Sequence, residues 1–271
     1  MNNLLKRLLL LLLVSFVLGA CSFERSVSVQ TTEKEVAPSA NEEEEIIFDF
    51  SEAHVNVASI GDSLTKGVGD TTDNGGYLPF LLQDLEAEST MKDVTINDYG
   101  KKGLSSAGLV KNLQKEPVQE LISKADIVII TIGGNDVMNI AKKNYSHLKI
   151  DYFKEGIQSY EDNVRKVLDL IRTHNEEADI YLVGLYNPFS QWFQDIKEFD
   201  EIMVSWNERS KEITLDYKDV YFVEIASLFT EENENLIYEG DFFHPNLKGY
   251  EIMGNAIFES IQENTISHLQ E

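Results

Sequence analysis

The chain has 271 residues, of which 42% are hydrophobic and 26% are charged, a composition typical of a globular protein with one large domain. Its formal net charge of −24 argues against nucleic-acid binding, because an acidic surface repels phosphate groups. The single cysteine, Cys21, rules out a disulfide within the chain.

The first segment, residues 1–20, has the pattern of a secretion signal. Lys6 and Arg7 precede an apolar stretch over 8–18 that is shorter than a membrane-spanning helix needs. The stretch ends in Leu-Gly-Ala-Cys, which resembles a bacterial lipobox and so implies cleavage before Cys21 and attachment of lipid to that cysteine. We therefore expect an extracytoplasmic protein anchored by lipid to the bacterial cell membrane. The alternative is a plain signal peptide with a chance cysteine.

A tether and one folded domain are expected after the signal. Residues 21–50 are rich in Ser, Thr and Glu and include an acidic run at 42–45, which favours a flexible linker over a binding tail. In the domain, over 51–271, short apolar segments alternate with segments of helical periodicity. This order indicates an α/β fold with a parallel sheet.

The predicted strands are 55–60, 94–99, 125–132, 179–185 and 220–225. The predicted helices are 77–88, 152–174, 199–217 and a last helix whose buried stripe is Leu247, Tyr250, Met253, Ile257 and Ile261. The aromatic segment 189–199 is interpreted as local packing, with a lid or an acyl-chain contact as the alternative.

The first predicted strand stops abruptly at Gly61-Asp62-Ser63. Glycine permits a sharp turn, which places Ser63 at the carboxyl end of the strand, where open α/β sheets bind ligands. An exposed serine hydroxyl at this place is a candidate nucleophile. The alternative is an ordinary turn or helix N-cap, because Asp and Ser both cap helices well.

Two further strand ends carry candidate donors for a negatively charged oxygen. Gly103 follows the second strand, and its backbone N–H is expected to face the site; a plain turn glycine is the alternative. Asn135 follows the third strand after two glycines, and its side-chain amide is a candidate oxyanion donor. Gly, Asn and Asp also favour turns, which is the simpler interpretation of that motif.

His244 is distinguished from the other four histidines by its neighbours. Asp241 lies three residues before it and Pro245 follows it. A tight turn lets Asp241 hold the Nδ1–H of the imidazole and leaves Nε2 free as a base. With Ser63 as the nucleophile, these residues supply the parts of an acyl-transfer site, and an acyl-serine intermediate would then be hydrolysed by water.

Together these motifs resemble the SGNH hydrolase superfamily of GDSL-type esterases and lipases, over about residues 55–262. Its four eponymous residues correspond to Ser63, Gly103, Asn135 and His244, with Asp241 as the acid. The resemblance implies a three-layer, flavodoxin-like α/β/α sandwich with strand order 2-1-3-4-5. It also implies ester or thioester hydrolysis without metal or cofactor. With the lipobox, the chain resembles Bacillus-type lipoproteins of this family.

The second motif departs most from the family, which often has Ser-Gly followed by Asp or Ala and then Thr. Here it reads Lys-Gly-Leu-Ser over 102–105, and the glycine is kept.

An α/β-hydrolase is excluded, because its Gly-x-Ser-x-Gly elbow would need glycine where Thr65 stands. A non-catalytic surface-binding lipoprotein is the alternative from another class. No spacing of His and Asp indicates a metal site. We expect a monomer that acts on a lysophospholipid, an acylated or acetylated wall polymer or another small ester. The sequence leaves open the acyl-chain length and the choice between ester and thioester.

Overall fold

The computed structural model describes residues 53–89, 91–188, 197–230 and 235–267. The predicted signal segment, Cys21 and the predicted tether lie outside the described residues, as does most of the aromatic segment. A parallel sheet of five strands forms the centre, in the order β2-β1-β3-β4-β5. The strands are β1 (Ala53–Gly61), β2 (Met91–Gly100), β3 (Ile127–Thr131), β4 (Asp179–Val183) and β5 (Val220–Val223). The predicted fold class and strand order are confirmed.

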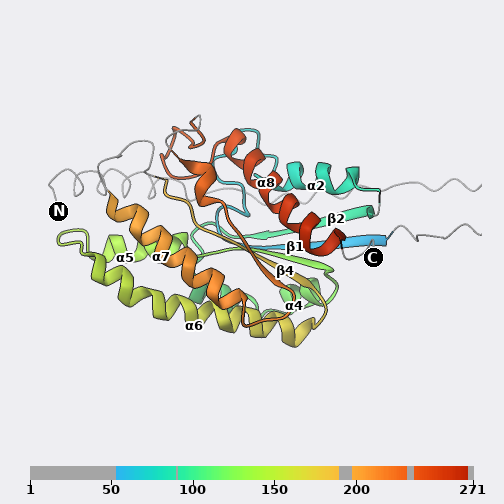
Figure 1. The fold of residues 1–271 in the computed structure, drawn as a ribbon, viewed down its shortest axis with the longest axis horizontal. Coiled ribbons are helices and arrows are strands. Elements are labelled where there is room, and N and C mark those ends of the chain that lie inside the picture. The colour runs from blue at the N-terminus through green and yellow to red at the C-terminus, as the bar shows by residue number, and fades with distance from the viewer. Residues whose placement is uncertain (1–52, 90, 189–196, 231–234, 268–271) are drawn as a thin grey trace, which may run out of the picture.

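Helices cover both faces of this sheet (Figure 1). One face carries α2 (Leu78–Ala87) and α8 (Leu247–Ile261). The other carries α3 (Ser106–Asn112), α4 (Glu116–Ser123), α5 (Gly134–Lys143), α6 (Ile150–His174) and α7 (Lys197–Thr214). Short helical turns over Ala226–Phe229 and Gln262–Ile266 complete the described elements. Among the described residues, no helix is both long and apolar enough to cross a membrane.

The central strand β3 shows why the sheet is buried on both faces. All five of its residues are inaccessible to solvent. Val128 and Ile130 belong to the core beneath α3–α7, whereas Ile127 and Ile129 belong to the core beneath α2 and α8. Because successive side chains of a strand point to opposite faces, an uninterrupted apolar run fills both cores at once.

Two expectations from the sequence need correction. The turn considered as the alternative for the Gly133 segment is not formed, because Gly133 is the N-cap of helix α5; helices α3, α4 and α5 lie outside the helices predicted from the sequence. These helices have only seven to ten residues, so they show few repeats of an apolar stripe. Leu247, predicted to be buried, is 39% exposed; it is the first residue of α8, and the buried residues of that helix begin at Gly249.

The end of β1 requires glycine. Gly61 pairs with Gly100 of β2 and with Thr131 of β3, so it is enclosed by backbone on both sides. Its φ is +150°, and a Cβ at this position would lie 2.3 Å from the carbonyl oxygen of Thr131. A side chain would therefore push the strands apart immediately before Ser63.

We expect Gly61→Ala to lower the free energy of unfolding by roughly 3–5 kcal/mol, through backbone strain and overpacking together. Gly75→Ala is the matched control, because Gly75 also has positive φ, at +101°, but its Cβ would meet nothing within 4 Å. The control should lose only about 1–3 kcal/mol, from strain alone. Urea unfolding of both variants measures the difference, and equal losses would contradict the enclosure of Gly61.

Candidate active site

Three predicted side chains form one hydrogen-bonded chain. His244 Nε2 lies 2.8 Å from Ser63 Oγ, and His244 Nδ1 lies 2.6 Å from Asp241 Oδ2. Ser63 and His244 are both buried, at 4% and 1% exposure, although 181 positions separate them in the sequence. When Nδ1–H donates to the carboxylate, Nε2 is left to accept the serine proton. This arrangement can generate a nucleophilic serine oxygen.

The turn that carries His244 also fixes its carboxylate partner. Asp241 Oδ1 accepts the backbone N–H groups of Phe243 (2.9 Å) and His244 (3.0 Å). Phe242, which follows Asp241 directly, has a φ of +55°, an unusual conformation for a bulky residue. Burial opposes ionisation of Asp241, but the hydrogen bond and charge of His244 and the two N–H donors outweigh it and lower the pKa of this carboxyl. Asp241 is thus kept ionised beside the imidazole.

A tyrosine also holds this turn. Tyr186 Oη donates to the carbonyl oxygen of Phe243 at 2.7 Å. Its ring stacks on Phe229 with 4.2 Å between centroids, which fixes the direction of the hydroxyl. The backbone N–H of Tyr238 donates to the carbonyl oxygen of His244 at 2.8 Å. Sequence reasoning missed Tyr186, which lies just beyond β4 without a motif of its own.

The turn that carries Ser63 contains a buried acid. Asp62 is 3% exposed, and its Oδ1 accepts the N–H of Leu64 and the hydroxyl of Thr131, each at 3.0 Å. Burial raises the pKa of Asp62 to about 6, although the hydrogen bonds from Leu64 and Thr131 oppose the shift. Sequence reasoning gave Asp62 no role of its own beyond capping; its place directly before Ser63 was the available signal.

The structure brings the two predicted oxyanion segments together. Asn135 Nδ2 donates to the carbonyl oxygen of Leu104 at 3.0 Å, next to Gly103. An amide has two N–H groups, so one remains for a ligand in the pocket that Asn135 shares with Ser63. Gly103 is exposed with a φ of +77°, and a Cβ there would meet nothing within 4 Å. Its place at an open loop beside Asn135 fits the expected role.

Asp136 fixes that loop at a second point, which sequence reasoning also missed. Its carboxylate accepts the backbone N–H of Ser106 at 2.8 Å and the hydroxyl of Ser106 at 2.7 Å. Asn163 Nδ2 donates to the same hydroxyl at 3.0 Å. Burial raises the pKa of Asp136 despite the hydrogen bonds from Ser106. The first turn of α5 therefore sets the position of the loop that carries Gly103.

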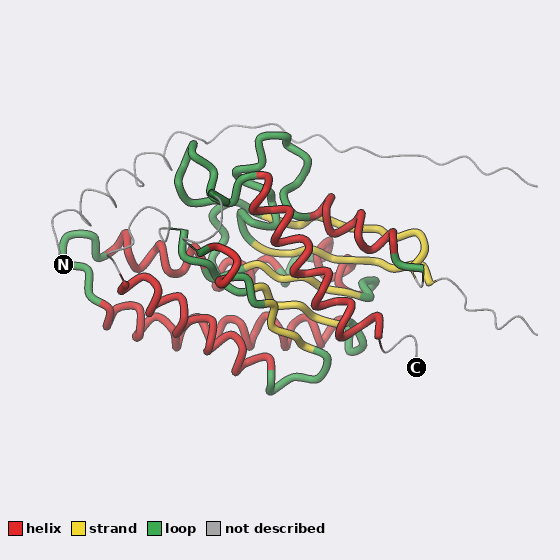
Figure 2. Tube along the Cα trace, turned by 45° about the horizontal axis from the view of Figure 1, so that its top comes forward, coloured by secondary structure: helices red, strands yellow, loops and turns green. Residues whose placement is uncertain are grey.

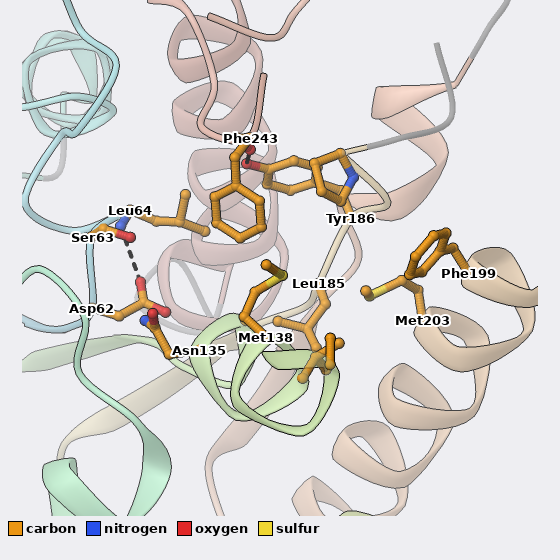
Figure 3. Close-up of a pocket in the computed structure, with 14 residues that line it drawn as sticks. Asp62, Ser63, Leu64, Asn135, Met138, Leu185, Tyr186, Phe199, Met203 and Phe243 are labelled. Atoms are coloured by element: carbon orange, nitrogen blue, oxygen red, sulfur yellow. Dashed lines mark hydrogen bonds between the residues drawn. The ribbon is translucent and has the colours of Figure 1, made fainter. Parts of the chain in front are cut away.

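An apolar pocket opens beside Ser63 (Figure 3). It is lined by Asp62, Ser63, Leu64, Gly134, Asn135, Val137, Met138, Ala141, Leu185, Tyr186, Pro188, Phe199, Met203 and Phe243. Phe199, the last residue of the predicted aromatic segment, is one of them, whereas residues 189–196 lie outside the described part of the chain. The described residues contain no group of three or more His, Cys, Asp or Glu side chains arranged to hold a metal ion.

Comparison with known proteins gives a matching family model and several relatives. The model of the GDSL-like lipase/acylhydrolase family matches residues 59–252, from β1 into α8. YpmR of Bacillus subtilis, an uncharacterized protein, is 34% identical over 212 residues, which cover 78% of this chain and 82% of YpmR. The spore germination lipase LipC of Bacillus licheniformis is 26% identical over 204 residues, 73% of this chain and 92% of LipC.

Solved structures show the same fold. A lipase from a goat rumen metagenome superposes with a TM-score of 0.68 at 23% identity, covering 76% of this chain and 97% of that one. An acetylxylan esterase from Geobacillus stearothermophilus gives a TM-score of 0.54 at 22% identity, covering 78% and 95%. With the family model matching most of the folded domain, the chain belongs to the GDSL-like lipase/acylhydrolase family and is a hydrolase of ester bonds.

Proposed function

We propose that this protein is a serine esterase that cleaves carboxylic esters or thioesters through an acyl-serine intermediate at the outer face of the cell membrane. The observation that carries the proposal is the unbroken chain from Asp241 through His244 to Ser63. In this role Ser63 Oγ attacks the ester carbonyl while its proton passes to His244 Nε2. Asp241 stabilises the imidazolium that forms.

The carbonyl oxygen becomes negatively charged as the serine attacks. The backbone N–H groups of Ser63 and Gly103 and the side chain of Asn135 are assigned to this oxygen. His244 then returns its proton to the leaving alcohol or thiol, and the acyl group stays on Ser63. A water molecule, deprotonated by His244, attacks the acyl-serine and releases the carboxylic acid.

The substrate classes proposed are lysophospholipids, acylated or acetylated wall polymers and other small esters. The pocket beside Ser63 supports an ester with a hydrocarbon acyl group, because most of its lining side chains are apolar. LipC is named a lipase and the Geobacillus neighbour an acetylxylan esterase, so related proteins handle different acyl groups. The lipobox at Cys21 supports a location at the membrane surface, where such esters occur.

The central test is hydrolysis of p-nitrophenyl esters, from acetyl to palmitoyl, by the full-length protein in detergent. Ser63→Ala should lower kcat/KM by at least about a thousandfold, because the nucleophile is lost. A fluorophosphonate should label the wild-type protein at Ser63 and leave the variant unlabelled. A folded wild-type protein that neither hydrolyses any ester nor reacts with the fluorophosphonate would instead favour the non-catalytic, surface-binding alternative.

Asn135→Ala should lower kcat roughly a hundredfold or more, because one oxyanion donor is removed. Asn144→Ala is the matched control: Asn144 Nδ2 also donates to one backbone carbonyl, that of Ile140 at 2.9 Å, but at the opposite end of α5. Steady-state kinetics on the folded variants measure the effect. Near-normal turnover in Asn135→Ala would remove Asn135 from this role.

Cys21→Ser should move the protein from the membrane fraction to the soluble fraction, because the proposed site of lipid attachment is lost. Ser26→Ala, which keeps the cysteine, should stay with the membrane. Cell fractionation and the mass of the N-terminal peptide measure both variants. Equal membrane retention of the two variants would exclude an anchor at Cys21.

A further inference from the structure

The polar side chains of the pocket beside Ser63 lie at one end only. Asp62, Ser63 and Asn135 are grouped there, and the side chains beyond them are apolar apart from one tyrosine (Figure 3). The hydroxyl of that tyrosine, Tyr186, already donates to the carbonyl oxygen of Phe243. Beyond Ser63 the lining side chains therefore offer little to a sugar or a charged headgroup. They suit the hydrocarbon part of an acyl group.

Helix α7 forms the end of this pocket that is farthest from Ser63. Phe199 and Met203 are four residues apart, so they share one face of the helix. Both are buried, at 4% and 6% exposure. Figure 3 shows them at the opposite side of the pocket from Ser63, with Met138 and Leu185 between. An acyl chain that extends from Ser63 would therefore end against α7.

The pocket is small for a long acyl chain. Its cavity volume is about 40 Å³. A cavity that holds one water molecule needs roughly 10–15 Å³, so this cavity has room for only a few groups of that size. That is the tail of a butyryl or pentanoyl group. A palmitoyl chain would have to displace the side chains of α7.

Resting on the proposed esterase function, we propose that Met203, together with Phe199, is the specificity-determining wall that limits this enzyme to esters of short acyl chains. The preferred substrates then carry acyl groups of about four or five carbons. Long-chain lysophospholipids become poor substrates. Acetyl esters are hydrolysed less well than butyryl esters, because they leave the apolar cavity partly empty.

Met203→Ala tests the wall directly. The substitution removes three heavy atoms of the side chain at the far end of the pocket, so the optimum should move to acyl chains two to three carbons longer. One methylene in an apolar pocket changes kcat/KM by roughly tenfold or more. The ratio of kcat/KM for the octanoyl ester to that for the butyryl ester should therefore rise at least about tenfold. The assay is the p-nitrophenyl ester series with the full-length protein.

Two control variants show whether a change in chain-length preference comes from the position of Met203 or from the loss of any buried methionine. Met203→Leu nearly conserves volume and should keep the wild-type optimum. Met253→Ala makes the same truncation at a fully buried methionine of α8, in the core on the opposite face of the sheet. It should leave the chain-length preference unchanged, whatever it does to stability.

A second variant covers the case in which Met203→Ala does not fold. Ala141, on α5, lines the same pocket and is 2% exposed. Ala141→Met adds volume there and should lower kcat/KM for the butyryl ester relative to the acetyl ester by about tenfold or more.

The outcomes distinguish this inference from the proposed function. Ser63-dependent hydrolysis with an optimum at palmitoyl in the wild type would overturn the short-chain inference, as would a folded Met203→Ala protein with the wild-type optimum. Both results would leave the esterase intact. Failure of the wild-type protein to hydrolyse any ester or to be labelled at Ser63 would instead reject the esterase function itself.

Discussion

One buried hydroxyl, that of Thr131, holds the turn that carries Ser63. It donates to the carboxylate of Asp62, lies 2.8 Å from the hydroxyl of Thr65 and accepts the N–H of Thr65 at 3.3 Å. Thr131 is the last residue of β3 and its neighbour across the ladder is Gly61. Thr131 therefore ends β3 and also fixes how the chain leaves the neighbouring strand β1. A hydroxyl with all its partners inside the protein has little freedom to move.

This network carries a cost in stability. Burial disfavours the ionised form of Asp62 and raises its pKa to about 6. A buried carboxylate is tolerated only when donors surround it, and here they are the N–H of Leu64 and the hydroxyl of Thr131. Because the pKa is raised on folding, this group favours the folded state more as pH falls from about 6 toward 4. The hydrogen-bonded turn that carries Ser63 thus costs stability at neutral pH.

The strand order explains how distant motifs meet. Ser63, Gly103 and Asn135 follow β1, β2 and β3, which are neighbours in the sheet, and parallel strands end at the same edge. Figure 2 shows the long loops gathered at this end of the sheet. His244 arrives separately, from the loop before α8. The site therefore needs both faces of the sandwich to be folded.

Much of this could be predicted from the sequence because the signals are local. The apolar run of β3 is visible without any partner, and Asp241 and His244 share one short turn. The contact between Asp136 and Ser106 could not be predicted, because thirty positions separate two polar residues that are also common in turns. The pocket could not be predicted either, because its walls come from four separate parts of the chain: α5, α7, the end of β4 and the loop that carries His244.

The two halves of the site differ in what sets their geometry. Bond-forming groups must be placed to within a fraction of an ångström, and here they stand at the ends of strands and in turns closed by hydrogen bonds. The acyl end of the pocket is bounded by flexible side chains such as Met138 and Met203 on helices. Met138 lies on α5 and Met203 on α7, whereas Ser63 and His244 lie in turns outside these two helices. The fold can therefore keep one reaction while its acyl preference changes.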